Sequence, residues 1–279
     1  MEDRELHSMV AADDRHWWYR GRRRIVLSQL ERLSLPQEAV ILDAGCGSGR
    51  MLDELERYGM AFGLDSSAWA VAAARARGHS GVTLGTVEQM PYPDGTFDLV
   101  TCLDVLEHTA DHDRTLAELR RVIAPGGHLI VTVPAYQLLW SAHDEANRHY
   151  RRYRSGVLRE AARTGDWEVV RDTHFNSLLL PPLALVRILR KARRGGRGRS
   201  ELTFTPAWLD GLLASPFRIE AFLIRHGVRL PAGLSVLAVL RKPSTLPIPI
   251  PALPHPATFG SPRVAAPTGP VGPVALPGR

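Results

Sequence analysis

Two observations predict an α/β fold with a mostly parallel sheet and helices on both of its faces. First, strand and helix patterns alternate from residue 39 to residue 133, which is typical of parallel strands joined by helical crossovers. Second, a largely apolar strand pattern over 39–44 runs directly into Gly45, Gly47 and Gly49, and a helical pattern follows over 50–58. Such a turn lies at the carboxyl end of the first strand, where open α/β sheets bind ligands.

The individual elements follow from hydrophobic periodicity and from the positions of glycine and proline. Pro125, Gly126 and Gly127 are expected to end a helix and to turn the chain into the next strand. A loop is expected over 134–153. The expected strands are 39–44, 60–65, 82–85, 97–103, 128–133, 167–175 and 235–240, and the expected helices are 25–33, 50–58, 67–78, 111–124, 155–164 and 206–226.

The composition indicates one substantial core and a different C-terminal part. The 279 residues are 44% hydrophobic, whereas residues 243–279 hold eleven of the 21 prolines, which is typical of an extended or disordered tail. Cys46 and Cys102 give no disulfide or zinc spacing. Residues 1–14 lack a signal-peptide core, and the longest apolar run is shorter than the roughly 20 residues that span a bilayer. We therefore expect a cytoplasmic protein.

Basic residues are concentrated in one part of the chain. The net charge is +6, yet residues 148–199 alone contain fourteen basic and four acidic residues. Within this part an apolar run, 178–186, is followed by a cationic run that ends at Arg194. Two interpretations are open: peripheral contact of 178–199 with an anionic membrane surface, or a packed helix with an exposed basic end.

The spacing of the glycine turn separates two nucleotide-binding families. Dehydrogenases that bind dinucleotides carry G-x-G-x-x-G, whereas here the glycines alternate and Asp43 precedes them. Asp65, which ends the second strand, is expected in either family and does not discriminate between them. With the phrases MPYPDGTFDLV (90–100) and RVIAPGG (121–127), this pattern resembles the class I S-adenosylmethionine-dependent methyltransferases. The resemblance implies a Rossmann-like sheet of seven strands, the last two antiparallel, and S-adenosylmethionine as the cofactor.

The resemblance also implies where the cofactor binds. Gly45 and Gly47 would lie against its methionine part, Asp43 would orient its amino group, and Asp65 would accept hydrogen bonds from its ribose. Ordinary turn chemistry at the strand ends is the alternative for the two acids. The complete set of expected cofactor-binding residues is Tyr19, Asp43, Gly45, Cys46, Gly47, Gly49, Asp65, Ser66, Val87, Glu88, Met90 and Leu103.

Two of these regions depart from a simple motif match. Thr86 replaces the acid that usually meets the adenine amine in the family, which leaves stacking by Val87 and Met90. The aromatic residues 17–19 resemble an N-terminal lid over the cofactor. They could equally seal the first helix to the sheet.

The resemblance further implies a division of the chain. The family joins its sixth and seventh strands by a short link, so the long segment between them is expected to be a helical insertion that serves the substrate or a membrane surface. The expected parts are an N-terminal lid and helix (1–36), a cofactor-binding core (37–176), the insertion (177–234), the last core strand (235–243) and the proline-rich tail (244–279).

Histidines and acids follow the fourth and fifth strands, where an acceptor would meet the methyl group. The phrase W-S-x-H-D…H-x-R-R-Y over 140–153 resembles a bacterial subgroup often found with glycosyltransferases. A histidine paired with a carboxylate can remove a proton from a hydroxyl. His143 is therefore the first candidate base and Asp144 its orienting group, followed by His149 and His108. A loop that only closes the pocket is the alternative.

Basic and aromatic side chains of the same phrase are candidates for holding the acceptor. Arginine binds phosphate or carboxylate with two parallel hydrogen bonds, so Arg151, Arg152 and Arg154 could grip an anionic acceptor. Trp140 and Tyr153 are further candidates for contact with the acceptor. A solvated charged face is the alternative.

A metal site is not expected. His143, Asp144 and His149 form a set of two histidines and one carboxylate, but their spacing fixes no geometry.

The favoured function is methyl transfer to a small-molecule hydroxyl, on a sugar, a lipid-linked compound or a secondary metabolite. An NAD(P)-dependent oxidoreductase lacks support because the third-glycine spacing and a Ser/Tyr-x-x-x-Lys set are missing. A nucleic-acid methyltransferase is disfavoured because Leu103-Asp104-Val105 replaces D-P-P-Y, so nucleic acid is not an expected partner. A non-catalytic module that keeps the fold is the remaining alternative.

Overall fold

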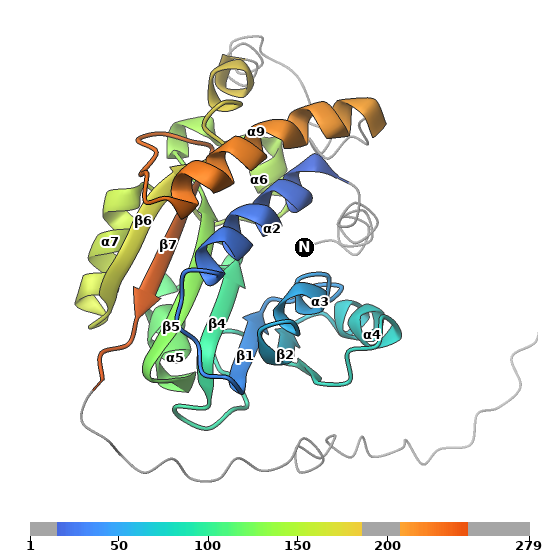
Figure 1. The fold of residues 1–279 in the computed structure, drawn as a ribbon, viewed down its shortest axis with the longest axis vertical. Coiled ribbons are helices and arrows are strands. Elements are labelled where there is room, and N and C mark those ends of the chain that lie inside the picture. The colour runs from blue at the N-terminus through green and yellow to red at the C-terminus, as the bar shows by residue number, and fades with distance from the viewer. Residues whose placement is uncertain (1–15, 186–206, 245–279) are drawn as a thin grey trace, which may run out of the picture. The chain divides into compact units, whose positions relative to one another are not determined.

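The computed structural model describes residues 16–185 and 207–244, which form a seven-stranded sheet with helices on both faces (Figure 1). The strand order is β3-β2-β1-β4-β5-β7-β6. The first five strands are parallel, and β7 is antiparallel to both β5 and β6. The predicted fold class is confirmed. The strands are β1 (Ala39–Ala44), β2 (Gly59–Asp65), β3 (Val82–Leu84), β4 (Phe97–Leu103), β5 (Ile123–Pro134), β6 (Glu168–Phe175) and β7 (Ser235–Arg241).

One hydrophobic cluster lies between the sheet and each of its two helical layers. On one face, side chains of α2, α3, α4 and α9 pack with one side of the sheet, and α2 lies beside α9. On the other face, α5 and α7 cover the sheet. The helices are α2 (Trp17–Leu30), α3 (Leu52–Leu55), α4 (Ala68–Ala76), α5 (His112–Val122), α6 (Ala142–Ala146), α7 (Ser155–Thr164) and α9 (Ala207–Arg225), with 3-10 turns η1 (Leu106–His108) and η2 (Gln137–Leu139).

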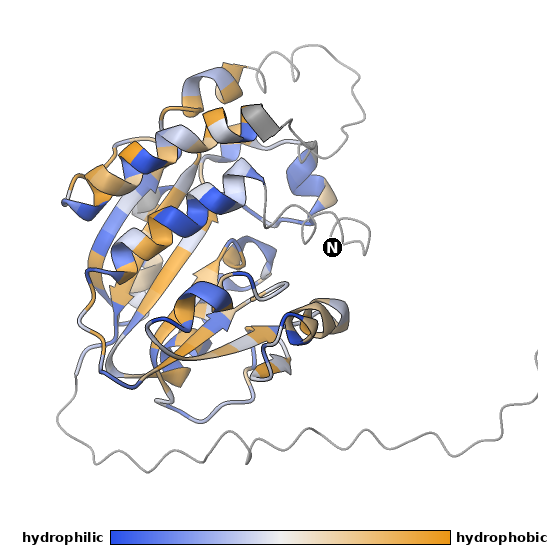
Figure 2. Cartoon of the chain, turned by 45° about the vertical axis from the view of Figure 1, so that its right-hand side comes forward, coloured by the Kyte–Doolittle hydropathy of each residue, from blue (hydrophilic) through white to orange (hydrophobic). Residues whose placement is uncertain are grey.

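The central strands are buried on both faces. Every residue of β1 is buried, and β4 is buried at all but one position. Figure 2 shows the same distribution, with hydrophobic residues gathered on the strands and mixed colours on the covering helices. Strands covered on both faces are expected to be continuously apolar, which is why residues 39–42 show no polar alternation.

Several predicted elements need correction. The helix predicted over 25–33 begins at Trp17, because the His16 side chain accepts a hydrogen bond from the Trp18 amide and caps it. The helix predicted over 50–58 is only α3. Residues 125–127 do not form a turn before the strand: β5 starts at Ile123, and they lie within it at a register shift against β4. The loop predicted over 134–153 contains η2 and α6.

The segment between β6 and β7 is described only in part. Glu220 of α9 accepts hydrogen bonds from the amides of Asn176, Ser177 and Leu178, at N–O distances of 2.5, 2.8 and 3.1 Å, which attaches the start of this segment to α9. Most of the basic part of 178–199, the leader 1–15 and the tail 245–279 lie outside the described residues. None of the described helices is long and apolar enough to cross a membrane.

Candidate active site at the carboxyl edge of the sheet

The glycine turn follows β1 and is tied to β2 by its backbone. Gly45, Gly47 and Gly49 have φ values of +84°, +54° and +81°, a region that side chains with a Cβ enter only with strain. The amides of Gly45 and Cys46 donate to the Leu64 carbonyl at 2.7 and 3.0 Å. The turn therefore requires glycine for its backbone conformation alone.

The three glycines differ in what surrounds them. A Cβ on Gly45 would lie 2.4 Å from Cγ2 of Val105, and one on Gly49 would lie 2.7 Å from the His79 ring. A Cβ on Gly47 would meet nothing within 4 Å. Gly45 and Gly49 thus permit close packing within the protein, while the open face at Gly47 leaves room for a ligand to approach the backbone.

Two carboxylates flank this open face at the ends of β1 and β2. Asp65 accepts hydrogen bonds from the amides of Gly47 and Ser67, both at 2.9 Å. Burial raises the pKa of Asp65, although these amides act in the opposite direction. Asp43 is buried and accepts a hydrogen bond of 2.6 Å from the Thr101 hydroxyl. The arrangement fits the polar groups of a nucleoside ligand.

The remaining expected cofactor residues differ in accessibility. Val87 and Met90 are buried in the core, Glu88 is half-buried, and Ser66 is exposed. The Cys46 side chain is buried, and its amide donates to the Leu64 carbonyl. The side chains of Tyr19 and Leu103 are also buried.

An ion pair links α2 to the end of β4, and no local sequence pattern predicts it. Nη1 of Arg22 lies 2.7 Å from Oδ2 of Asp104 and 3.2 Å from the Leu103 carbonyl oxygen. Asp104 has a φ of +57° and also accepts a hydrogen bond from the Thr132 hydroxyl at 3.2 Å. The guanidinium lies over the Tyr19 ring, 5.5 Å from its centre. This part of α2 is therefore fixed to the strand edge that carries the glycine turn.

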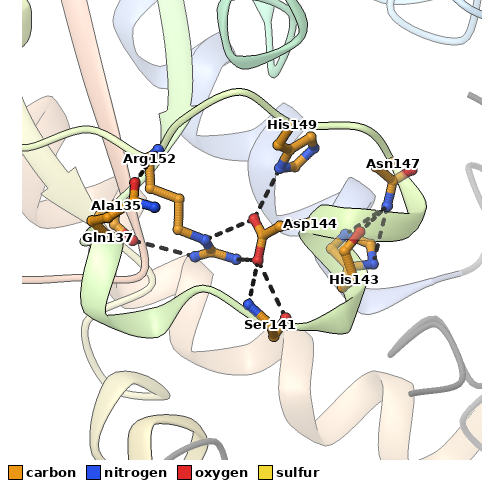
Figure 3. Close-up of polar contacts among 8 residues, drawn as sticks. All are labelled: Ala135, Gln137, Ser141, His143, Asp144, Asn147, His149 and Arg152. Carbon is orange, nitrogen blue, oxygen red and sulfur yellow. Dashed lines mark hydrogen bonds and ion pairs between the residues drawn. The ribbon is translucent and has the colours of Figure 1, made fainter. Parts of the chain in front are cut away.

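A buried ionic network organises the segment after β5, with Asp144 at its centre (Figure 3). Arg152 donates from Nε at 2.7 Å and from Nη2 at 2.9 Å, one bond to each carboxylate oxygen. Nδ1 of His149 lies 2.9 Å from Oδ1, and the Ser141 amide donates to Oδ2 at 2.8 Å. Burial opposes ionisation, but His149 and Arg152 outweigh it and hold the pKa of Asp144 well below its usual range.

The predicted pairing of His143 with Asp144 is wrong. In Figure 3 the His143 side chain turns toward Asn147, whose Nδ2 lies 3.2 Å from Nδ1 of His143. Neighbouring residues of a helix point about 100° apart, so α6 cannot direct both side chains to one place. The carboxylate orients His149 instead.

The predicted acceptor grip by Arg151, Arg152 and Tyr153 also needs correction. Arg152 is held by Asp144. Arg151 bonds to the His112 ring and to the carbonyls of Thr109 and Ala110. Tyr153 is buried in the core, with its hydroxyl 3.3 Å from the Leu106 carbonyl oxygen. These three side chains therefore contact other parts of the protein itself. Trp140 is half-buried.

A second cluster joins η1 to the Asp144 network. The rings of His108 and His149 lie 4.6 Å apart, nearly perpendicular to each other. Burial, reinforced by His149, lowers the pKa of His108 to about 4. Burial and the charge of Asp104 raise the pKa of Glu107 well above its usual range. At neutral pH the His108 imidazole is therefore uncharged, a weak base that can accept a hydrogen bond or a ligand bond.

Comparison with known proteins identifies the domain. Residues 42–131 match the family model described as a methyltransferase domain. A solved Haloferax volcanii structure, a complex of the Trm112 methyltransferase activator with its partner, superimposes with a TM-score of 0.58 at 22% identity, covering 88% of this chain and 97% of that one. At this identity the likeness concerns the fold.

Three relatives share part of the sequence. An uncharacterised 37.1 kDa protein of transposon Tn4556 from Streptomyces fradiae is 33% identical over 63% of this chain and 58% of its own length. A "Probable S-adenosylmethionine-dependent methyltransferase" of Mycolicibacterium smegmatis is 29% identical over 56% of this chain and 61% of its own length. A ubiquinone biosynthesis O-methyltransferase of Hahella chejuensis is 36% identical over 36% of this chain and 44% of its own length.

The chain thus spans less than two thirds of the length of these three relatives. The family match nevertheless covers the glycine turn, both acidic strand ends and most of β5. The chain carries a class I S-adenosylmethionine-dependent methyltransferase domain.

Proposed function

We propose that the protein transfers a methyl group from S-adenosylmethionine to a hydroxyl of a small molecule. One observation carries the proposal: the open face at Gly47, beside Asp65, shares a strand edge with the His108–His149 pair. When bound, the cofactor supplies an electrophilic methyl group. Its transfer to a hydroxyl oxygen breaks the carbon–sulfur bond, leaves a thioether and releases the hydroxyl proton.

The residues of the glycine turn would hold the cofactor. The unobstructed Gly47 backbone admits the ligand, and the Asp65 carboxylate accepts hydrogen bonds from ribose hydroxyls. Asp43 supports the turn from β1 through Thr101. Adenine would lie against the β3–β4 connection near Val87 and Met90, whose side chains are packed in the core.

The acceptor would lie over the histidine pair. Methyl transfer requires alignment of the two reactants and loss of the hydroxyl proton. His149, which Asp144 orients, is the candidate to take up the hydroxyl proton, and the uncharged His108 beside it would accept a hydrogen bond from the acceptor. The relative named for ubiquinone biosynthesis O-methylation supports an oxygen acceptor on a small molecule. The resemblance of residues 140–153 to enzymes found with glycosyltransferases supports a sugar or lipid-linked compound.

A lipid-linked acceptor would bring the protein to a membrane surface. On α9 the side chains of Leu212, Ile219 and Phe222 are exposed, Phe222 by 61%. Phe222 also lines a cavity of about 480 Å³ together with arginines of α2 and α9. Apolar side chains beside cationic ones suit an anionic lipid surface. In this proposal the segment 177–234 brings the protein to its lipid-linked acceptor, and the surface that contacts the membrane includes α9.

The function is tested first at the cofactor. Calorimetric titration with S-adenosylmethionine, S-adenosylhomocysteine and NADH should show binding of the two sulfur compounds only, and binding of NADH alone would refute the proposal. Incubation of an extract with the protein and methyl-labelled cofactor should then yield a labelled small molecule. Sedimentation with anionic and neutral vesicles tests the membrane contact, which should require anionic lipid and weaken in Phe222→Ser.

A further inference from the structure

We propose that Glu107, His108 and His149 bind one divalent transition-metal ion at the acceptor side of the site. Glu107 and His108 belong to η1, directly after β4, and His149 follows α6. Each residue offers one ligand atom, and these atoms lie within 4.8 Å of one another. Two segments that are distant in sequence thus place two imidazoles and one carboxylate around a common point.

The Glu107 carboxylate is the first argument for a cation. Glu107 is only 1% exposed. Its Oε2 atom has no hydrogen-bond partner among the described residues. A buried polar atom without a partner is costly. A bound cation at this position would satisfy the oxygen.

The anchoring of the two imidazoles is the second argument. His149 uses Nδ1 to bond the Asp144 carboxylate, which Arg152 in turn holds from two nitrogens. His108 is hydrogen-bonded to the Asn147 backbone. Each ring therefore has one nitrogen fixed by an acceptor and a second nitrogen left for a ligand bond. Metal-binding histidines are typically held in this way, since the outer bond fixes both the tautomer and the ring orientation.

The donor set indicates the class of metal. Two imidazoles and one carboxylate suit zinc and its first-row neighbours, whereas magnesium and calcium prefer oxygen ligands throughout. Three protein ligands leave coordination positions open, as in catalytic zinc and iron sites. Two residues before Glu107, Val105 packs against Gly45 of the cofactor turn. The ion would therefore sit at the strand edge where donor and acceptor meet.

The role of the ion rests on the proposed methyl transfer. A hydroxyl oxygen bound to a divalent cation loses its proton to solvent more readily, because the cation stabilises the negative charge on oxygen. The proposed acceptors are thereby limited to small molecules that carry a hydroxyl whose oxygen can coordinate a metal ion. Metal binding itself does not depend on this role.

The test measures metal binding by the full-length protein without reference to turnover. Chelator-treated protein is titrated with Co²⁺ and Zn²⁺, by calorimetry and by the visible absorption that Co²⁺ acquires with nitrogen ligands. One ion should bind per chain. Glu107→Gln and His149→Ala should each weaken binding at least 10-fold. Asp144→Asn, which weakens the outer anchor of His149 together with the Arg152 pair, should weaken it roughly 10- to 100-fold. His143→Ala is the matched control, since His143 bonds Asn147 and lies outside the set.

Equal Co²⁺ binding by the wild type, Glu107→Gln and His149→Ala would overturn the metal site. Glu107→Gln changes one atom, so it stays informative if His149→Ala unfolds, which circular dichroism reports. S-adenosylmethionine affinity is measured in the same samples. Cofactor binding without metal binding refutes the metal site and leaves direct action by the imidazoles, whereas metal binding without cofactor binding refutes the methyl transfer and retains the site.

Discussion

The donor and acceptor sides of this site are built from different materials. On the donor side, the backbone forms the site: three glycines have positive φ values, and amides of the turn donate to Leu64 and Asp65. On the acceptor side, side chains form the site: Asp144 joins Arg152, His149 and Ser141 in one buried network. The donor side depends on the backbone conformations that its residues permit. The acceptor side depends on which side chains are paired with one another.

This difference predicts different sensitivities. A backbone-built turn fails when a Cβ is added and is indifferent to charge. A buried ionic network fails when one member is removed, because its partner then remains charged without compensation. The substitutions below test the contrast in order of decreasing expected effect.

Asp144→Ala should have the largest effect. It leaves the Arg152 guanidinium buried beside an unanchored His149, and breaking a buried ion pair from one side costs about 3–5 kcal/mol. Urea denaturation should report this loss in the free energy of unfolding. Asp94→Asn is the control: Asp94 pairs with Arg121 but is 80% exposed, so the cost should stay below about 1 kcal/mol. Equal losses in the two variants would contradict the network's central role.

Gly45→Ala should come next, with a loss of roughly 2–4 kcal/mol. The methyl group meets Val105 at 2.4 Å, and the positive φ adds its own cost. Gly47→Ala should lose only about 1–2 kcal/mol, because no neighbour lies near its Cβ, yet it should weaken cofactor binding more than its stability suggests.

The double variant Gly45→Ala, Val105→Ala separates the two costs at Gly45. Removing the Val105 side chain should restore the packing part and leave the cost of the positive φ. If thermal unfolding shows no recovery, the clash is not what makes glycine necessary at this position.

The same contrast explains what the sequence could predict. Sheet strands come from local apolar runs and turn residues, and the predicted strand order along the chain is confirmed. The early start of α2 comes from the local cap at His16, whereas the error at residues 125–127 comes from non-local pairing. Residues 125–127 lie inside β5 because Gly126 and Gly127 exchange hydrogen bonds with Lys242, far along the chain. No local pattern reveals such a partner.

The site divides in the same way. The glycine turn and Asp65 are recognisable locally, because residue type and spacing alone specify the backbone conformation. The partner of Asp144 is not. Proximity in sequence favoured His143, whereas the capping bonds of Ser141 turn the carboxylate toward His149 and Arg152. Such a choice is made by packing, which the sequence does not display directly.

Asp65→Asn sharpens the comparison on the donor side. Asparagine keeps the shape of the side chain, but its amide nitrogen cannot accept one of the two backbone bonds that the Asp65 oxygens accept. The free energy of unfolding should therefore fall by about 1 kcal/mol, while loss of the charge that accepts the ribose bonds should lower cofactor affinity roughly 10- to 100-fold. Burial raises the pKa of Asp65. In the wild type, affinity should therefore decrease as pH falls through this raised pKa, beginning above the usual range of about 4. Calorimetry across pH should show this dependence in the wild type and its absence in Asp65→Asn.

The Arg22–Asp104 pair should give the smallest effect, because it joins the two kinds of construction. Its side chains are 13% and 21% exposed, intermediate between the Asp144 network and a surface pair. Asp104 also holds a positive φ, so asparagine, which tolerates that conformation, is the substitution that removes charge alone. Arg22→Met and Asp104→Asn should couple by about 1 kcal/mol in a double-mutant cycle of unfolding free energies. Strict additivity would mean that α2 is held by its apolar contacts with α9 and the sheet, and that the ion pair only orients the strand end.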